Sequence, residues 1–337
     1  MPYVCKYCFS DRELIAFITS QTKFDDCNFC DHKTVECLAL EELFDFFKEL
    51  ISNFKKKDDG DTLKSKIQGN WSLFSSLDIA YKVLNNVIDN IETEIKNADE
   101  RVDFSDEILD NVNYWDKLKN QLIWNNRYLT DINYLTDELG WDGFFGSQIA
   151  LRKEEKLYRA RIHHSSSEPP YTNKSMFCPP KDKATAGRAN PIGIPFLYLS
   201  DNDKTVLYEI RASYLDEVSI GTFILNAEIT NEIFISDFTE SITIFHPSMV
   251  SERIKSTLLK QKISADLSKP MRRYDSELDY IPTQFICEFI KVYTGVQGIK
   301  FRSSLHTVGN NIVIFDQDIM QCIKVVKAKI NKVSISI

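Results

Sequence analysis

Four cysteines near the N-terminus have the spacing of a metal site. Cys5 and Cys8 form one CxxC pair, and Cys27 and Cys30 form a second pair after 18 intervening residues. Each pair presents two sulfurs from one tight turn, and a structural zinc ion is held by four such ligands in a tetrahedron. Because cysteine side chains would fill all four coordination positions and leave none open for water, we predict a structural zinc site. The second-choice ligands in the same segment are His32 and Cys37.

A second set of chemically useful side chains lies in five segments of the C-terminal half. These segments are LYRARIH (157–163), SMFCPP (175–180), GRANPIGIPFLYLSDNDKTVLYEIR (187–211), DYIPTQFICEFIK (279–291) and GIKFRSS (298–304). Together they resemble the RES domain family, in the version that follows a HEPN-like N-terminal domain. The resemblance covers roughly residues 155–330. Its most specific element is GRxNPxGxPxLYLS followed by a glutamate eleven residues after the tyrosine.

The resemblance implies a fold, an activity and a set of site residues. The family's Arg, Glu and Ser signature falls on Arg159, Glu209 and Ser303, and further motif positions fall on Arg188 and Tyr198. The family is similar in fold to ADP-ribosyltransferases. Its members consume NAD by phosphorolysis or hydrolysis, and several are toxins restrained by an antitoxin. We therefore expect NAD as substrate, phosphate or water as acceptor, and an inhibitor or antitoxin protein as partner.

These residue types suit the cleavage of the nicotinamide–ribose bond. Nicotinamide leaves as a neutral ring, so the ribose that carries developing positive charge is the group needing stabilisation. A carboxylate, here Glu209, can supply it. Arg159 and Arg188 would hold the pyrophosphate, which an arginine fork suits better than lysine does. Tyr198 would face the nicotinamide ring, and Ser303 would hydrogen-bond to ribose or nicotinamide.

Hydrophobic periodicity predicts a helical domain between the cysteines and these motifs. Residues 38–54 have the apolar spacing of an amphipathic helix. A charge-rich linker or solvated loop is expected at 55–66, and further helices are expected to begin after Ser76 and Ser105. Three glycines in ELGWDGFFG (138–146) then end the helical periodicity.

From about residue 155, short β-like runs outnumber the helical stretches and do not alternate regularly with them. These runs are 156–162, 196–200, 218–229, 232–238, 298–303, NIVIF (311–315) and 322–330. This pattern favours an α+β domain over a doubly wound parallel sheet. We therefore predict three parts: a zinc-binding module (1–37), a helical, HEPN-like domain without nuclease activity (38–150) and a mixed α/β RES domain with an ADP-ribosyltransferase-like fold (151–337).

Charge and hydropathy exclude several classes of protein. The net charge is −8, and residues 1–150 hold 16 Lys and Arg against 28 Asp and Glu, whereas residues 151–337 hold 25 against 21. An acidic N-terminal half argues against general nucleic-acid binding. No apolar run approaches the roughly 20 residues that span a bilayer, and the N-terminus does not have the pattern of a signal peptide. We therefore expect a cytoplasmic protein without membrane association.

Motifs of several other enzyme classes are absent from the sequence or lie on the wrong kind of element. The HEPN ribonuclease motif, Arg-x4–6-His on a helix, is matched in spacing by Arg159 and His164, but these lie on an expected strand, and residues 38–150 contain no histidine. Neither GxGxxG, a P-loop nor GxSxG is present. Two alternatives stay open: an ADP-ribosyltransferase that modifies a protein or nucleic acid, and a non-enzymatic interaction protein.

Overall fold

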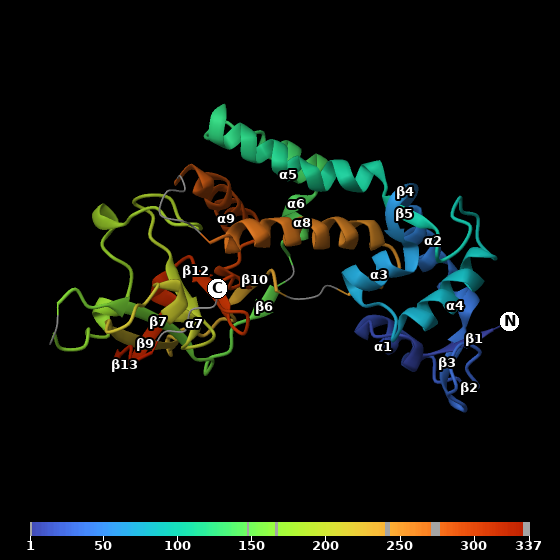
Figure 1. Ribbon diagram of the computed structural model, residues 1–337, viewed down its shortest axis with the longest axis horizontal. Coiled ribbons are helices and arrows are strands. Elements are labelled where there is room, and N and C mark those ends of the chain that lie inside the picture. The colour runs from blue at the N-terminus through green and yellow to red at the C-terminus, as the bar shows by residue number, and fades with distance from the viewer. Residues whose placement is uncertain (1, 147, 166–167, 240–242, 271–276, 333–337) are drawn as a thin grey trace. The chain divides into compact units, whose positions relative to one another are not determined.

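The computed structural model describes residues 2–146, 148–165, 168–239, 243–270 and 277–332. The chain divides into two compact units, Met1–Tyr114 with Ser241–Leu259 (unit 1) and Trp115–Glu240 with Lys260–Ile337 (unit 2). Two of the three limits along the chain fall inside helices, α5 (Asp106–Trp124) and α8 (Val250–Ser268), both labelled in Figure 1. A segment of the C-terminal half thus belongs to unit 1, so the units follow limits other than those of the three predicted domains.

Unit 1 combines short helices with two small antiparallel sheets. One sheet has the order β1-β3-β2, and the other pairs β4 with β5. The strands are β1 (Tyr3–Cys5), β2 (Phe24–Asp25), β3 (Val35–Ala39), β4 (Phe54–Thr62) and β5 (Arg101–Phe104). The helices are α1 (Arg12–Ser20), α2 (Phe44–Ser52), α3 (Leu63–Trp71) and α4 (Leu77–Ile88), together with the adjoining parts of α5 and α8. The helix expected at 38–54 begins as a 3-10 turn at Leu40–Leu43 and continues as α2.

The charge-rich segment 55–66 is neither a linker nor a solvated loop, and that expectation was wrong. It forms most of β4 and the start of α3. Charged side chains are accommodated there because the partner strand carries Asp103, whose carboxylate forms ion pairs with Lys57 at 2.9 Å and with Lys66. The rings of Phe54 and Phe104 also stack across the strand pair, with centroids 5.2 Å apart. Side-chain pairs of this kind are the unit of stabilisation in a sheet.

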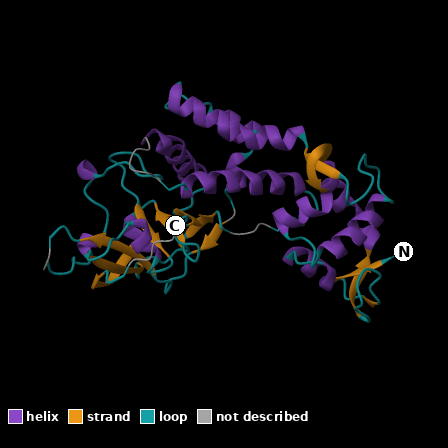
Figure 2. Ribbon diagram, in the orientation of Figure 1, coloured by secondary structure: helices purple, strands orange, loops and turns teal. Residues whose placement is uncertain are grey.

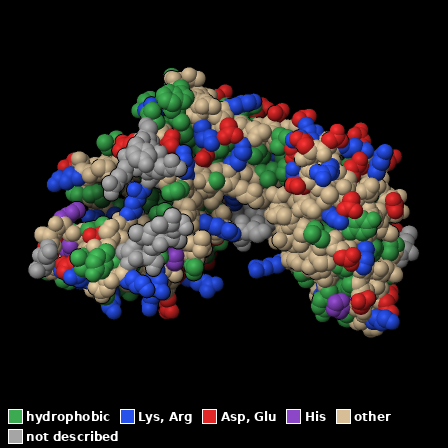
Figure 3. Space-filling model, viewed as in Figure 1, with side chains coloured by type: hydrophobic (Ala, Val, Ile, Leu, Met, Phe, Trp, Pro, Cys, Tyr) green, Lys and Arg blue, Asp and Glu red, His purple; other side chains and the backbone are tan. Residues whose placement is uncertain are grey.

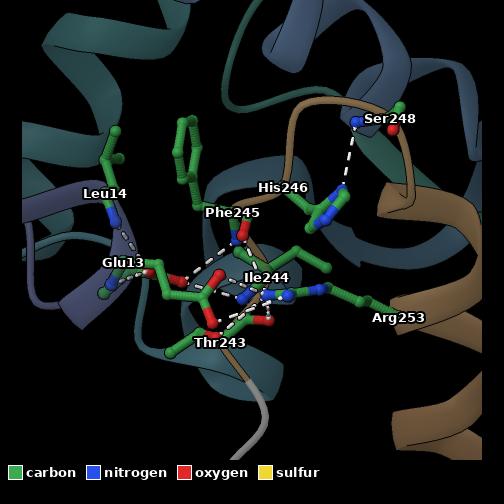
Figure 4. A network of polar contacts seen from close by, with 9 residues as sticks. Glu13, Leu14, Thr243, Ile244, Phe245, His246, Ser248 and Arg253 are labelled. Atoms are coloured by element: carbon green, nitrogen blue, oxygen red, sulfur yellow. Dashed lines mark hydrogen bonds and ion pairs between the residues drawn. The ribbon is translucent and has the colours of Figure 1, made fainter. Parts of the chain in front are cut away.

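Polar caps define the helices of unit 1. Ser76 caps α4 as predicted, because its hydroxyl accepts from the backbone N–H of Ile79 at 3.2 Å. Asp11 caps α1 with one carboxylate oxygen, and its other oxygen accepts from the backbone N–H groups of Ile244 and Phe245 at 2.7 and 3.1 Å. Figure 4 shows this network, in which Arg253 also reaches Glu13 at 2.8 Å. These bonds attach the returning segment of unit 1 to its first helix.

Unit 2 is built on an eight-stranded sheet of described residues, in the order β13-β9-β7-β8-β12-β11-β10-β6. Its strands are β6 (Gln148–Ala150), β7 (Leu157–Ile162), β8 (Leu197–Ser200), β9 (Glu217–Leu225), β10 (Phe234–Asp237), β11 (Gly298–Arg302), β12 (Asn310–Ile314) and β13 (Met320–Lys329). Neighbours are antiparallel except β10 and β11, which are parallel. The mixed α/β character predicted for the C-terminal half is confirmed, and β7 to β13 lie in runs that the sequence predicted as strands.

Helices and a continuous apolar layer complete unit 2. The helices are α6 (Trp141–Phe144), α7 (Thr205–Glu209) and α9 (Ile281–Tyr293), with the adjoining parts of α5 and α8. Figure 2 distinguishes these helices (purple) from the strands of the sheet (orange). The core on the sheet consists of buried aliphatic and aromatic side chains, chiefly Leu157, Leu197, Phe223, Ile235, Ile312 and Ile314. Among the described residues, no helix has the length and apolar character needed to cross a membrane.

Candidate active site

Four adjacent strands bring the sequence motifs of unit 2 together. The strands β7, β8, β12 and β11 are neighbours in the sheet, although they come from distant parts of the chain. Tyr158 of β7 lies opposite Ser200 of β8, and Ser200 lies opposite Asn311 of β12. Ser303 directly follows β11, which pairs with β12. The strand order therefore gathers LYRAR, LYLS and GIKFRSS into one region.

The carboxylate of Glu209 is held by one of its two oxygens. Ser303 Oγ donates to Oε1 at 2.6 Å, and Asn311 Nδ2 donates to the same oxygen at 2.8 Å. Ser303 Oγ in turn accepts from the backbone N–H groups of Leu305 and His306 at 3.3 and 3.2 Å, so its own hydrogen is directed at the carboxylate. No other described residue hydrogen-bonds to Glu209 Oε2. That oxygen remains available to a ligand.

The short helix α7 ends on Glu209 and sets its position. It begins where Asn202 Oδ1 accepts from the backbone N–H groups of Lys204 and Thr205, at 2.9 and 3.3 Å. Arg211 adopts a left-handed backbone conformation with φ 53°, which ends the helical path two residues after Glu209. The carboxylate therefore belongs to the last residue of a short helix whose start is held by Asn202 and whose path ends at Arg211.

The turn at 303–309 packs closely on α7. Thr205 Oγ1 and His306 Nδ1 share a hydrogen bond of 2.7 Å, and the His306 ring stacks on Tyr208 with centroids 4.9 Å apart. A Cβ at Gly309 would lie 1.9 Å from Thr205 Oγ1. The turn can reach α7 only because residue 309 is glycine.

Asn310 fixes the start of β12 against the end of β8. The Asp201 carboxylate accepts from the backbone N–H and the Nδ2 of Asn310, at 2.8 and 2.7 Å. Ser200 Oγ donates to the carbonyl of Asn310 at 2.7 Å. These bonds set the register that brings the neighbouring Asn311 level with Glu209.

Arg188 lies in the loop before β8 and is held through its backbone and its side chain. Thr283 donates to the Arg188 carbonyl at 2.6 Å, and Gln284 donates to the carbonyl of the preceding glycine at 2.8 Å. The guanidinium donates to the carbonyl of Asp266 at 3.1 Å and lies over the Tyr280 ring, with Cζ 5.4 Å from the centroid. Its Nη2 is buried with no hydrogen-bond partner among the described residues, and burial lowers the pKa of Arg188.

Arg159 on β7 is another cation without an acidic partner. Its Nη1 donates to the carbonyl of Tyr198 at 3.4 Å, and no described carboxylate forms an ion pair with it. Burial, with a smaller contribution from the positive charge of Arg161, lowers the pKa of Arg159 to about 10. A guanidinium in such surroundings is stabilised by an anionic ligand.

The hydroxyl of Tyr198 on β8 holds the loop that carries Arg188 in place through two hydrogen bonds. The hydroxyl donates to Asn190 Oδ1 at 2.8 Å and accepts from the Ala189 backbone N–H at 2.9 Å. Burial raises the pKa of Tyr198. A Cβ at Gly187 would lie 2.6 Å from this hydroxyl, so the close approach of loop and ring requires glycine. Only the ring of Tyr198 is therefore free to contact a ligand.

A cavity of about 390 Å³, here named the reaction cavity, connects these side chains. This size is within the range of small-molecule sites. Its lining includes Arg159, Arg188, Tyr198, Glu209, Tyr280 and Asn311. Four of the five residues predicted from the sequence thus border one cavity. The fifth, Ser303, acts on it through its hydrogen bond to Glu209.

Two residues of the site, Asn311 and Tyr280, were missed by sequence reasoning. Asn311 opens a run, NIVIF, that was predicted only as a strand. Tyr280 lies in the 3-10 turn Glu277–Tyr280, directly before α9. Their segments were part of the family resemblance, but neither residue stood on one of its assigned positions.

The four predicted cysteine ligands lie together in unit 1. Their Sγ atoms all fall within 4.8 Å of one another, with Cys5–Cys30, Cys8–Cys27 and Cys5–Cys8 at 3.4, 3.5 and 3.9 Å. Four thiolates at about 2.3 Å from a zinc ion would be about 3.8 Å apart, so the arrangement fits that ion. The second-choice ligands lie outside the group: His32 Nδ1 is 3.3 Å from Cys30 Sγ, and Cys37 donates to the carbonyl of Asp25.

Comparison with known proteins gives one family match. The RES domain matches residues 156–333, which is more than half of the chain. No curated protein shows significant sequence similarity to it. Among solved structures, the M. tuberculosis MbcT–MbcA toxin–antitoxin complex contains a chain with 13% identity and a TM-score of 0.28, and the alignment covers 53% of this chain and 86% of that one.

Proposed function

Because the chain belongs to the RES domain family, we propose that it is an enzyme that cleaves the nicotinamide–ribose bond of NAD. The observation that best supports this proposal is the arrangement of Glu209, whose Oε1 is held by Ser303 and Asn311 beside a cavity bordered by Arg159 and Arg188, neither of which forms an ion pair with a described carboxylate. Such a cavity offers one fixed negative charge and several positive charges to one ligand. NAD needs both, at its ribose and at its diphosphate.

Glu209 acts in the bond-breaking step. As the bond from nicotinamide to the ribose C1′ breaks, its electron pair stays on the ring nitrogen and positive charge develops on the ribose. The carboxylate stabilises that charge without having to reorganise, because two donors already orient it. Oε2, the oxygen left without a partner among the described residues, faces the ribose or its hydroxyl groups.

Arg159 and Arg188 bind the anionic part of the substrate. Both border the reaction cavity, and Arg188 has a buried N–H group with no described partner. A phosphate oxygen would satisfy this donor. The rings of Tyr198 and Tyr280 supply flat apolar surface for the nicotinamide end.

The direct test is to incubate the purified protein with NAD and to follow free nicotinamide. Products formed with and without inorganic phosphate identify the acceptor: ADP-ribose 1″-phosphate indicates phosphorolysis, and ADP-ribose indicates hydrolysis. Label transferred to protein or nucleic acid would instead support the ADP-ribosyltransferase alternative. Absence of nicotinamide release under all conditions would contradict the proposal.

We also propose that the active protein depletes cellular NAD and is restrained by an inhibitor protein. This part rests on the family resemblance, in which several members are toxins. Expression of the wild-type chain in a bacterial host should lower the NAD pool and arrest growth, whereas Glu209→Gln should not. Unchanged NAD in cells that express the folded wild-type chain would contradict it.

In unit 1 we propose a structural zinc ion bound by Cys5, Cys8, Cys27 and Cys30. The support is the fit of the sulfur separations to a tetrahedral thiolate site. Such an ion joins β1 and the turn after it to the segment before β3, so it closes the N-terminal sheet.

A further inference from the structure

A second cavity adjoins the reaction cavity in unit 2 and has no role so far. It has a volume of about 490 Å³ and is here named the arginine cavity. Its lining includes Arg159, Arg161, His164, Tyr171, Thr185 and Tyr198. Arg159 and Tyr198 border both cavities, whereas Glu209 borders only the reaction cavity and Arg161 only the arginine cavity. The two spaces therefore meet at Arg159.

Two guanidinium groups lie side by side on the wall of this cavity. Arg159 and Arg161 occupy alternate positions of β7, which place their side chains on the same face of the strand. The charge of Arg161 contributes to the lowered pKa of Arg159, as expected for two close cations. No described carboxylate pairs with either arginine, and no Asp or Glu is among the described residues that line the cavity. The described residues thus leave two neighbouring positive charges without a negative partner.

The hydrogen bonding of Arg161 is also incomplete. Its Nη2 donates to the carbonyl of Phe177, which holds the side chain in place. Its Nε is buried and has no hydrogen-bond partner among the described residues. A buried donor without an acceptor is costly, and an anion in the cavity would remove that cost.

We propose that the arginine cavity binds the adenosine-diphosphate half of the dinucleotide, with Arg161 as a further phosphate ligand beside Arg159. This proposal rests on the proposed function and adds the direction in which the substrate lies. The ribose to be cleaved must lie by Glu209 in the reaction cavity, so the diphosphate falls at the junction, by Arg159. The remaining half of the molecule then enters the arginine cavity, where Tyr171 offers ring surface to the base.

The first experiment measures binding without catalysis. ADP is titrated calorimetrically into the full-length wild-type protein, Arg161→Ala and Arg161→Lys. We expect the Kd of ADP to rise about 10- to 100-fold in Arg161→Ala, the effect of losing a hydrogen bond to a charged group. Arg161→Lys should give a smaller rise, because it keeps the charge and loses the fork. The matched control is Arg152→Ala, which removes the same charge from an exposed position bordering neither cavity and should change Kd less than twofold.

The second experiment compares NAD with nicotinamide mononucleotide, which lacks the adenosine monophosphate half. Arg161→Ala should raise KM for NAD at least tenfold more than it raises KM for the mononucleotide. Equal rises for the two substrates, or an ADP Kd that is the same in wild type and Arg161→Ala, would overturn the proposal. If Arg161→Ala does not fold, as judged by circular dichroism, Arg161→Lys decides: an unchanged ADP Kd overturns the proposal.

The two experiments separate this proposal from the proposed function. A protein that binds ADP through Arg161 and leaves NAD intact would retain the subsite and refute NAD cleavage. A protein that cleaves NAD with no dependence on Arg161 would support NAD cleavage and refute the proposed subsite.

Discussion

At the scale of single residues, the site depends on how one carboxylate is held. Ser303 and Asn311 both donate to Glu209 Oε1, so the orientation of the group is fixed while its second oxygen stays accessible. A glutamate at a helix end without these donors would be an ordinary solvated side chain. The pair of donors is the feature that makes Glu209 suited to a positively charged transition state.

We expect Glu209→Gln to lower the rate of NAD cleavage by about 10²–10³-fold while the protein remains folded. The amide keeps the size of the side chain, and its oxygen can still accept from Ser303 and Asn311. What it lacks is the charge that faces the ribose. Nicotinamide release by the purified variant gives the rate, and its melting curve serves as the control for folding. A folded variant with near-wild-type release would refute the catalytic role.

The arginines should act mainly in binding. The diphosphate carries the same charge in substrate and transition state. Contacts to it therefore stabilise the bound substrate and the transition state equally. Arg159→Ala and Arg188→Ala should therefore raise KM about 10- to 100-fold and lower kcat by a smaller factor. Some loss of kcat is expected, because binding also orients the ribose. Steady-state kinetics beside Glu209→Gln test this division. Arginine variants that lose kcat as severely as Glu209→Gln at unchanged KM would contradict it.

At the scale of elements, local patterns were predictable from the sequence and non-local register was not. The strands of unit 2 and the cap at Ser76 follow from alternation and from local hydrogen bonding. The segment 55–66 was misread as a linker because its charges are compensated by a strand some 40 residues away. Asn311 escaped notice for a similar reason: its approach to Glu209 depends on the pairing of β12 with β8. The four predicted site residues that border the cavity were found through the family resemblance, which encodes such register implicitly.

The packing of the 303–309 turn on α7 can be tested through Gly309. An alanine Cβ would lie 1.9 Å from Thr205 Oγ1, so the turn must move away from the helix and carry Ser303 with it. We expect Gly309→Ala to destabilise the protein by about 1–3 kcal/mol and to lower kcat for NAD. Gly143→Ala is the matched control, because a Cβ there meets nothing within 4 Å. Chemical denaturation and nicotinamide release measure the two effects. A Gly309→Ala protein as stable and active as Gly143→Ala would show that this contact does not position the site.

At the scale of the whole molecule, the acidic residues are unevenly distributed along the chain, and each unit has a core cluster of its own. The acidic excess lies in the first 150 residues, yet Figure 3 shows Lys and Arg interspersed with Asp and Glu on the visible face of unit 1. That face has no large basic patch of the kind nucleic-acid binding requires. One core cluster, which includes Cys5 and Cys8, consists of residues of unit 1, whereas the cluster on the large sheet consists of residues of unit 2. All residues of both cavities also belong to unit 2.

This separation predicts what loss of the metal should do. The purified protein should contain about one zinc per chain, and Cys5→Ser with Cys8→Ser should reduce it to near zero, because two ligands cannot hold the ion tightly. Both sulfurs are buried in the unit 1 core, so the double variant should unfold that unit at a lower temperature. NAD cleavage should persist at a reduced level, since no cavity residue lies in unit 1. Elemental analysis, a melting curve and nicotinamide release measure the three outcomes.

The control is Cys37→Ser, which lies outside the four-cysteine group and should leave the metal content unchanged. Zinc retained in the double variant would place the ligands elsewhere, and complete loss of cleavage in a chain whose unit 2 remains folded would show that the zinc module is needed for the reaction.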